Sequence, residues 1–239
     1  MLAEGRRQLE RALAAGVCVT QVYASPSLFL GSGDDALVRE AECRGARVVE
    51  LGADAFRSIV GSLRPDGIAA IVERPRASLR RLPHDGLIAI AAGIERPGNL
   101  GAVVRTAEAA GAAALVVADA ATDPFHPESV RGSVGTVFTL PVVHATGAAT
   151  VAWAREHQVR LLVATPDGPQ PVWGADFTAS GTAVVVGGER YGVGADWLAA
   201  ADETVCIPMA GSADSLSVAV AAGIVLFEAS RQRVNARRT

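Results

Sequence analysis

The chain has 239 residues and a net charge of −3 at neutral pH, with half of its residues hydrophobic and only 5% aromatic. This length suffices for one large domain or two small ones, and the charge lacks the strongly basic balance of a typical nucleic-acid-binding domain, although net charge excludes that class only weakly. The cysteines Cys18, Cys43 and Cys206 are far apart, which argues against a zinc site or a disulfide framework and favours a reducing cytoplasm. The first residues lack the uninterrupted apolar core of a signal peptide.

All 22 basic residues are arginines. The planar guanidinium binds phosphate through two parallel hydrogen bonds, but a biased base composition of the gene explains the preference equally well. Four arginines lie within residues 74–81 and four within residues 231–238. Each cluster fits either a phosphate-binding surface or an ordinary solvated one.

The first 73 residues are predicted to form a compact α/β unit. Helices and strands alternate in the order αβαβαβ, with helices over 4–15, 34–43 and 53–60 and strands over 17–24, 46–51 and 67–72. Residues 74–86 then carry two prolines, four arginines and little periodicity. This composition indicates a linker.

From residue 87 to 239 the alternation resumes on a longer scale. Strands are predicted over 87–92, 114–118, 137–143, 160–164, 182–186 and 204–207, and helices over 100–110, 127–133, 148–157, 195–200 and 215–233. The pattern is typical of a doubly wound parallel sheet, in which ligands bind beyond the carboxyl ends of the strands. The functional residues are therefore expected in the loops after Ala92, Ala164, Val186 and Ile207.

Familiar motifs do not occur in these loops. The sequence has no G-x-G-x-x-G after the first strand of either unit, no phosphate-binding P-loop and no G-x-S-x-G elbow. The four histidines show no metal-ligand spacing, so no metal site is predicted.

The loop after the first long strand contains Pro97-Gly98, which predicts a turn, and Asn99, which is placed to cap the following helix. Gly101 allows another backbone or a ligand to approach closely. Arg105 is expected within the first two turns of the helix, near the loop. Taken alone, Asn99 is equally well a simple cap and Arg105 a simple surface charge.

Two further loops stand out. Residues 187–194 contain four glycines that bracket Glu189, which suits binding through main-chain groups or a merely flexible connection. In the last stretch, Asp214 or Ser215 is predicted to cap a helix that begins near residue 215. That helix is apolar on nearly every side and too short to span a bilayer, which favours a core or a subunit interface.

Together these stretches resemble the signature of the SpoU-type RNA ribose 2′-O-methyltransferases of the SPOUT superfamily. The three motifs read Asn99-x-Gly101-x-x-x-Arg105, Gly187-x-Glu189-x-x-Gly192, and Ile207-Pro-Met-x-Gly211 leading to Ser215-Leu216. The match covers residues 87–233 in order and approximate spacing. The first 72 residues look like the small L30e-like RNA-binding domain that many members carry ahead of the catalytic unit.

The resemblance implies an RNA-binding domain over 1–73, a linker over 74–86 and a catalytic domain over 87–239 with a deep trefoil knot. It also implies S-adenosylmethionine as cofactor, held largely by backbone groups in the knot, and a homodimer that forms through the knotted domain. Carried over position by position, the cofactor-binding residues are Gly187, Ile207 and Leu216, with Thr165 and Met209 as further candidates.

Methyl transfer to a ribose requires a 2′-hydroxyl held against the methyl carbon, and the hydroxyl proton must leave. The resemblance assigns central roles to Arg105 and Asn99, with Glu189 and Ser215 in support. A guanidinium normally stays charged and cannot accept a proton. We therefore expect Arg105 to bind the phosphate beside the target ribose and to stabilise the developing alkoxide, with Glu189 orienting it or its loop.

One position departs from the family pattern, because Ser217 stands where the third motif usually has Asn. A serine offers one short hydroxyl in place of the two donors and one acceptor of an amide.

The substrate expected from the extra domain is ribosomal RNA, 23S RNA in particular, for housekeeping or antibiotic resistance. The alternatives are a tRNA methyltransferase, a weak or inactive RNA-binding relative, and an unrelated α/β enzyme that uses another nucleotide.

Overall fold

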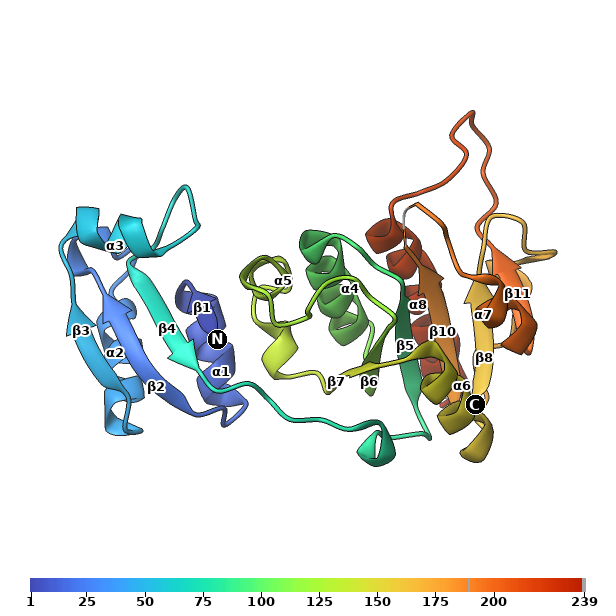
Figure 1. Ribbon diagram of the computed structural model, residues 1–239, viewed down its shortest axis with the longest axis horizontal. Helices are drawn as coiled ribbons and strands as arrows, with labels where there is room; N and C mark the ends of the chain where they lie inside the picture. The colour runs from blue at the N-terminus through green and yellow to red at the C-terminus, as the bar shows by residue number, and fades with distance from the viewer. Residues whose placement is uncertain (189, 238–239) are drawn as a thin grey trace.

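The computed structural model describes residues 1–188 and 190–237 and arranges them as two lobes along its longest axis (Figure 1). The smaller, N-terminal lobe contains a four-stranded sheet, and the larger lobe contains a seven-stranded parallel sheet. The predicted fold class, a small α/β unit followed by a parallel-sheet domain, is confirmed.

The N-terminal lobe is built on a mixed sheet in the order β1-β4-β2-β3. Its elements are β1 (Leu2–Glu4), α1 (Arg6–Ala14), β2 (Val19–Ala24), α2 (Asp34–Cys43), β3 (Arg47–Glu50), α3 (Ala53–Ile59) and β4 (Ile68–Val72), with a 3₁₀ turn η1 (Pro26–Leu28) before α2. β4 runs antiparallel to both β1 and β2. The predicted αβαβαβ order missed β1, because three residues are too few to show a strand period.

Residues 74–86, predicted as a linker, run along the edge of the molecule that lies lowest in Figure 1 and include a short 3₁₀ turn, η2 (Leu79–Arg81). Near its start, Arg74 donates two hydrogen bonds to Asp123, of 3.1 and 2.8 Å, and its guanidinium lies 4.4 Å from the ring centre of Phe125. Near its end, Leu82 is buried in the core of the large lobe. The linker is thus attached to the large lobe at both ends.

The lobes also touch directly. Arg131 on the large lobe forms an ion pair with Glu4 at 3.4 Å, and Arg11 donates a 2.5 Å hydrogen bond to the carbonyl of Val134. These polar contacts fix where the N-terminal lobe rests on the large one.

The seven strands of the large lobe are all parallel, in the order β7-β6-β5-β10-β8-β11-β9. They are β5 (Leu87–Ala92), β6 (Ala114–Ala118), β7 (Val142–Ala145), β8 (Arg160–Ala164), β9 (Gln170–Pro171), β10 (Thr182–Gly187) and β11 (Glu203–Cys206). The central strands are continuous runs of Ala, Val, Ile and Leu because both faces of the sheet are covered.

Four helices cover the two faces of the sheet. α4 (Pro97–Ala109) and α8 (Val218–Ala236) pack on one face, and α6 (Gly147–Glu156) and α7 (Ala195–Ala200) pack on the other. α5 (Pro127–Gly132) packs against α4 and against β1 of the N-terminal lobe. Successive residues of β5 alternate between these two cores: Leu87, Ala89 and Ala91 belong to the first, and Ile88, Ile90 and Ala92 to the second.

Two strands of the large lobe differ from the prediction by more than one residue. The strand predicted over 137–143 begins only at Val142, because left-handed residues at Val134 and Gly135 turn the chain into a 3₁₀ helix, η3 (Thr136–Phe138). A further 3₁₀ turn, η4 (Val172–Gly174), follows the unpredicted strand β9. That strand has only two residues and ends in a proline, a composition tolerated at a sheet edge and invisible to a periodicity search.

The C-terminal arginine cluster has a structural role where it is described. Arg233 donates hydrogen bonds to the carbonyls of Phe177, Ala179 and Ser180, and Arg231 is paired with Glu228 at 2.7 Å. Burial, together with the neighbouring Arg237, lowers the pKa of the Arg233 guanidinium. Arg233 thus holds α8 against the segment before β10, whereas the pair of Arg231 and Glu228 lies within α8. Arg238 lies outside the described residues.

Gly101 marks the tightest contact between α4 and α5. A Cβ at this position would lie 2.3 Å from the carbonyl oxygen of Ser129 and 2.9 Å from the amide nitrogen of Ser133. The close approach expected at Gly101 is therefore the approach of a neighbouring backbone. It fixes the position of α4 beside the loop that follows β5.

We predict that Gly101→Ala lowers the free energy of unfolding by about 1–3 kcal/mol, because the added methyl overlaps the α5 backbone. Gly98→Ala is the matched control in the same helix: its Cβ meets nothing within 4 Å, so stability should hold or rise by up to about 1 kcal/mol. Urea unfolding of both variants tests this. Equal stabilities would show that α4 and α5 are not in contact at Gly101.

Candidate functional site

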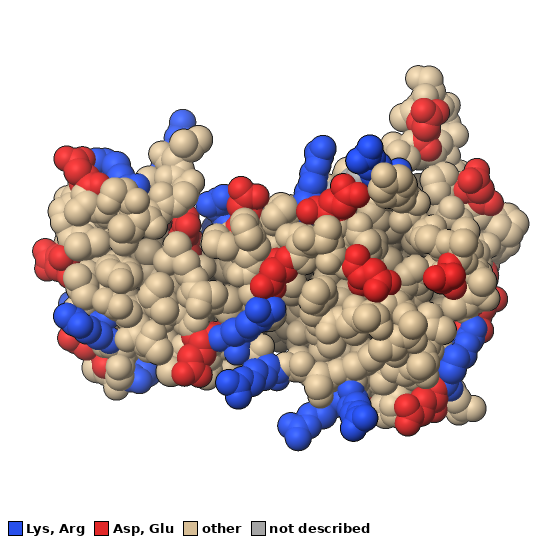
Figure 2. Space-filling view, in the orientation of Figure 1, with Lys and Arg blue, Asp and Glu red and all other residues tan. Residues whose placement is uncertain are grey.

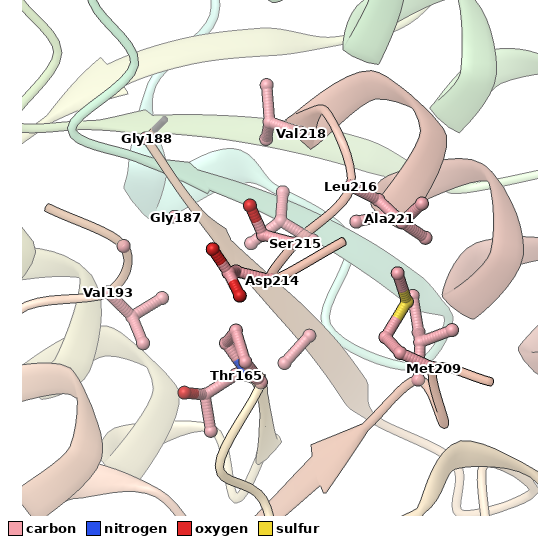
Figure 3. A pocket seen from close by; sticks show the side chains of 15 residues that line it. Thr165, Gly187, Gly188, Val193, Met209, Asp214, Ser215, Leu216, Val218 and Ala221 are labelled. Atoms are coloured by element: carbon pink, nitrogen blue, oxygen red, sulfur yellow. The ribbon is translucent and has the colours of Figure 1, made fainter. Parts of the chain in front are cut away.

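Three neighbouring strands of the large sheet end at one place. β8 pairs in parallel with both β10 and β11, so the carboxyl ends of all three meet at the same edge. A cavity opens there (Figure 3). Its lining comes from the loops after these strands and from the start of α8: Ala164, Thr165, Pro166, Val186, Gly187, Gly188, Gly192, Val193, Ile207, Met209, Asp214, Ser215, Leu216, Val218 and Ala221.

One wall of the cavity consists of main chain. A Cβ on Gly187 would lie 2.2 Å from the carbonyl carbon of Gly192, and a Cβ on Gly188 would lie 2.4 Å from the carbonyl oxygen of Gly93. The amide of Gly192 also donates a 3.0 Å hydrogen bond to the carbonyl of Gly188. These approaches require glycine, so the loop after β10 closes tightly on itself and on the loop after β5.

The opposite wall comes from residues 207–217, which form a long loop between β11 and α8 that projects from the molecule (Figure 1). Met209, Asp214, Ser215 and Leu216 from this loop border the cavity (Figure 3). Apart from the carboxylate of Asp214, the described lining residues carry no ionisable side chain. The cavity therefore combines apolar side chains, exposed main chain and one acidic group.

The helix predicted from residue 215 begins later. α8 starts at Val218 with Ser217 at its N-cap, and no side chain makes a capping hydrogen bond there. The prediction that Asp214 or Ser215 caps this helix is therefore wrong. Burial of Val218 fixes the first turn, and the extended conformation of Ser217 places both polar residues outside the helix.

The structure brings all five predicted cofactor-binding residues together. Gly187, Ile207, Leu216, Thr165 and Met209 all line the same cavity, and Ser215 lines it too. Sequence reasoning missed Val193, Val218 and Ala221. The last two occupy the first turn of α8, where the apolar pattern indicated burial but gave no sign of a cavity.

The residues of the first motif lie elsewhere. α4 begins at Pro97 with Arg96 at its N-cap, so Asn99 lies in the first turn and is not the predicted cap; proline at the first helical position explains the earlier start. Arg105 is the ninth residue of α4, about 12 Å along the helix axis and beyond the two turns expected. Neither residue lines the cavity.

The two side chains differ in their surroundings. Asn99 is half-buried and has an interaction partner, whereas Arg105 is exposed to solvent. Glu189, the remaining predicted catalytic residue, lies outside the described residues. Within residues 1–188 and 190–237, no three His, Cys, Asp or Glu side chains are grouped so as to hold a metal ion.

Comparison with known protein families defines the class. The model of the SpoU rRNA Methylase family matches residues 86–227, and that of the RNA 2′-O ribose methyltransferase substrate-binding family matches residues 2–78. The chain therefore belongs to the SpoU rRNA methylase family, as the three motifs predicted.

Individual relatives agree with this assignment. The chain is 34% identical to a 23S rRNA (uridine(2479)-2′-O)-methyltransferase of Streptomyces viridochromogenes, over 99% of this chain and 77% of the relative. It is 32% identical to a 23S rRNA (adenosine(1067)-2′-O)-methyltransferase of Streptomyces laurentii, over 100% of this chain and 88% of the relative. The solved structure of the SpoU methyltransferase AviRb from S. viridochromogenes in complex with AdoMet superposes with a TM-score of 0.87 at 31% identity, over 98% of this chain and 90% of that one.

Proposed function

We propose that this protein is an S-adenosylmethionine-dependent RNA ribose 2′-O-methyltransferase that acts on 23S ribosomal RNA. The observation that carries the proposal is the cavity at the carboxyl ends of β8, β10 and β11, which is lined by the second and third motifs of the family. The named relatives that match nearly the whole chain act on 23S rRNA, which favours ribosomal RNA over tRNA.

The cavity fits the cofactor by the chemistry of its walls. Apolar side chains at Val186, Ile207 and Leu216 suit the flat adenine ring, and the main chain at Gly187 supplies polar groups without side chains in the way. Thr165 and Met209 also line the cavity. When bound here, S-adenosylmethionine would supply an electrophilic methyl group.

The groups that handle the RNA are proposed from the first motif and its partners. Arg105 is exposed, so its guanidinium is free to bind the phosphate beside the target ribose and to stabilise the 2′-oxygen as its proton passes to water. Asn99, Glu189 and Ser215 would hold Arg105, the ribose or the loops in position. Of these, Ser215 borders the cavity itself.

We propose a division of labour between the lobes, with residues 1–73 as an L30e-like RNA-binding domain, 74–86 as the linker and 87–239 as the catalytic domain. The substrate-binding family match over residues 2–78 supports the first assignment. Figure 2 shows basic groups intermixed with acidic ones over most of the face in view, with several basic groups along the lower edge, where Figure 1 places the linker. RNA binding would then depend on particular arginines and not on a broad basic field.

The resemblance to the SpoU family also suggests a particular path for the chain. We propose that the large lobe is threaded as a trefoil knot; β11, the last strand in the chain, lies between the earlier strands β8 and β9, an order that suits such threading.

A cytoplasmic location is proposed from the reduced, widely spaced cysteines. Among the described residues, no helix is long and apolar enough to cross a membrane.

Ser217 leaves one alternative open to test, an RNA-binding relative with weak or no activity. The residue is the exposed N-cap of α8, and its hydroxyl makes no capping bond. It is therefore available to contact a ligand, but at shorter reach than an asparagine. Activity measurements separate the two hypotheses.

The first prediction concerns the product. Mapping of 2′-O-methyl groups in total RNA, from cells with and without this protein, should reveal one additional methylated ribose in 23S rRNA. A new site in tRNA alone would replace the substrate assignment. Tight S-adenosylmethionine binding with no new site in any RNA would support the inactive relative.

The second prediction concerns Arg105. Arg105→Ala should lower the rate of methyl transfer by at least about 10²-fold, because a charged donor at the developing oxyanion is lost, and the Kd for S-adenosylmethionine should stay within a few-fold. Arg105→Lys keeps the charge but loses the planar fork, so its rate should lie between those of the wild type and the alanine variant. Single-turnover assays and calorimetry measure both quantities; full activity of Arg105→Ala would remove the assignment.

The proposed homodimer is supported by the outer face of α8. Val220, Phe227 and Val234 are 50%, 51% and 45% exposed, and their spacing of seven residues places them along one side of the helix. Large apolar side chains aligned in this way mark a contact surface. A second copy of this chain fits it.

The third prediction follows from that surface. Light scattering at micromolar concentration should give twice the monomer mass of 24.5 kDa, and Phe227→Asp should shift the protein toward monomer. Leu30→Asp, an exposed leucine on the N-terminal lobe, is the control that should leave the mass unchanged. A monomeric wild-type protein would contradict the dimer.

A further inference from the structure

The cofactor cavity contains one acidic side chain that the proposed function does not use. Asp214 is the sole charged residue between Cys206 and Glu228, and it lies in the loop that forms the outer wall. We infer that the Asp214 carboxylate binds the ammonium group on the methionyl part of S-adenosylmethionine. This inference rests on the proposed function and names a further residue that determines how tightly this site binds its cofactor.

Asp214 is not occupied with a structural task. An aspartate just before a helix commonly caps it, but α8 begins four residues later at Val218, with Ser217 at the N-cap. Within the part of the chain that the structure describes, the Asp214 carboxylate accepts no hydrogen bond and forms no ion pair. Neither helix capping nor internal pairing therefore accounts for the carboxylate.

The carboxylate instead faces the cavity. Figure 3 shows it extending toward the space that Thr165 and Val193 border, beside the hydroxyl of Ser215. Asp214 as a whole is exposed, so the charge lies at the rim of the cavity, in contact with water. A carboxylate at a rim keeps most of its hydration and can still pair with a cation on the ligand.

The chemistry of the cofactor decides which group it meets. S-adenosylmethionine carries two positive centres, the sulfonium and the ammonium, and one carboxylate. An ionised aspartate acts only as a hydrogen-bond acceptor. Of the two cationic centres, the ammonium offers three N–H donors and the sulfonium offers none, so the ammonium is the one that can form both an ion pair and a hydrogen bond with Asp214.

The positions of the lining residues also favour the ammonium as the partner of Asp214. Val186 and Val218 are buried, and they form an apolar interior that suits the adenosine. The polar amino-acid end of the ligand is then left at the rim, where Asp214 lies.

The test compares three ligands on the full-length protein by calorimetry. S-Adenosylmethionine carries both cations, S-adenosylhomocysteine carries only the ammonium, and 5′-methylthioadenosine carries neither. Asp214→Asn should weaken the first two by roughly three- to tenfold, as expected for a partly exposed charge pair, and leave the third unchanged. Asp167→Asn, an exposed carboxylate two residues beyond Thr165 that does not line the cavity, should change none of them.

Each other outcome has a distinct meaning. Weaker binding of S-adenosylmethionine alone would assign Asp214 to the sulfonium and overturn the inference. Equal weakening of all three ligands would overturn the inference, because it would mean that Asp214 contacts the shared adenosine or that the substitution disturbs the loop, and no weakening would remove Asp214 from the site. A wild-type protein that binds no S-adenosylmethionine would refute the proposed function itself.

Discussion

The parallel register of β5, β10, β8 and β11 is the constraint on which the rest of the site depends. Because these strands run in one direction and lie side by side, segments separated by more than a hundred residues meet at one edge of the sheet. The loop after β10 packs directly against the loop after β5 at Gly188, since only a glycine can approach the carbonyl of Gly93 so closely. The cavity follows from this geometry: its inner wall is backbone, and its outer wall is the loop that leads from β11 into α8.

In the proposed function, binding of the methyl donor and binding of RNA fall to different groups of residues. The cavity has apolar and main-chain walls, which suit a methyl donor, while Arg105 is exposed on α4 and is not among the residues that line the cavity. A protein with net charge −3 can then engage RNA through a few exposed guanidinium groups without a basic field over its whole surface. The arginines at the C-terminus illustrate the distinction, because Arg231 and Arg233 are engaged in bonds within the chain.

Much of this arrangement could be predicted from the sequence, for physical reasons that differ by element. Strands such as Leu87–Ala92 and Arg160–Ala164 were predicted with correct bounds, because buried parallel strands are continuous apolar runs. The strand predicted from residue 137 failed where two left-handed residues redirect an equally apolar run. The residues around the cavity could be named only because motifs tie them to a family. The direction of the Asp214 side chain could not be predicted, since local sequence favoured a helix cap.

We propose that one cavity, formed where β8, β10 and β11 end, holds the methyl donor. A crystal structure of the protein with S-adenosylmethionine would locate it. We expect adenosine density between the main chain of Gly187 and the side chains of Ile207 and Leu216, with the amino-acid end toward the loop of residues 207–217. Density for the cofactor at any other place on the molecule would refute this assignment of the cavity.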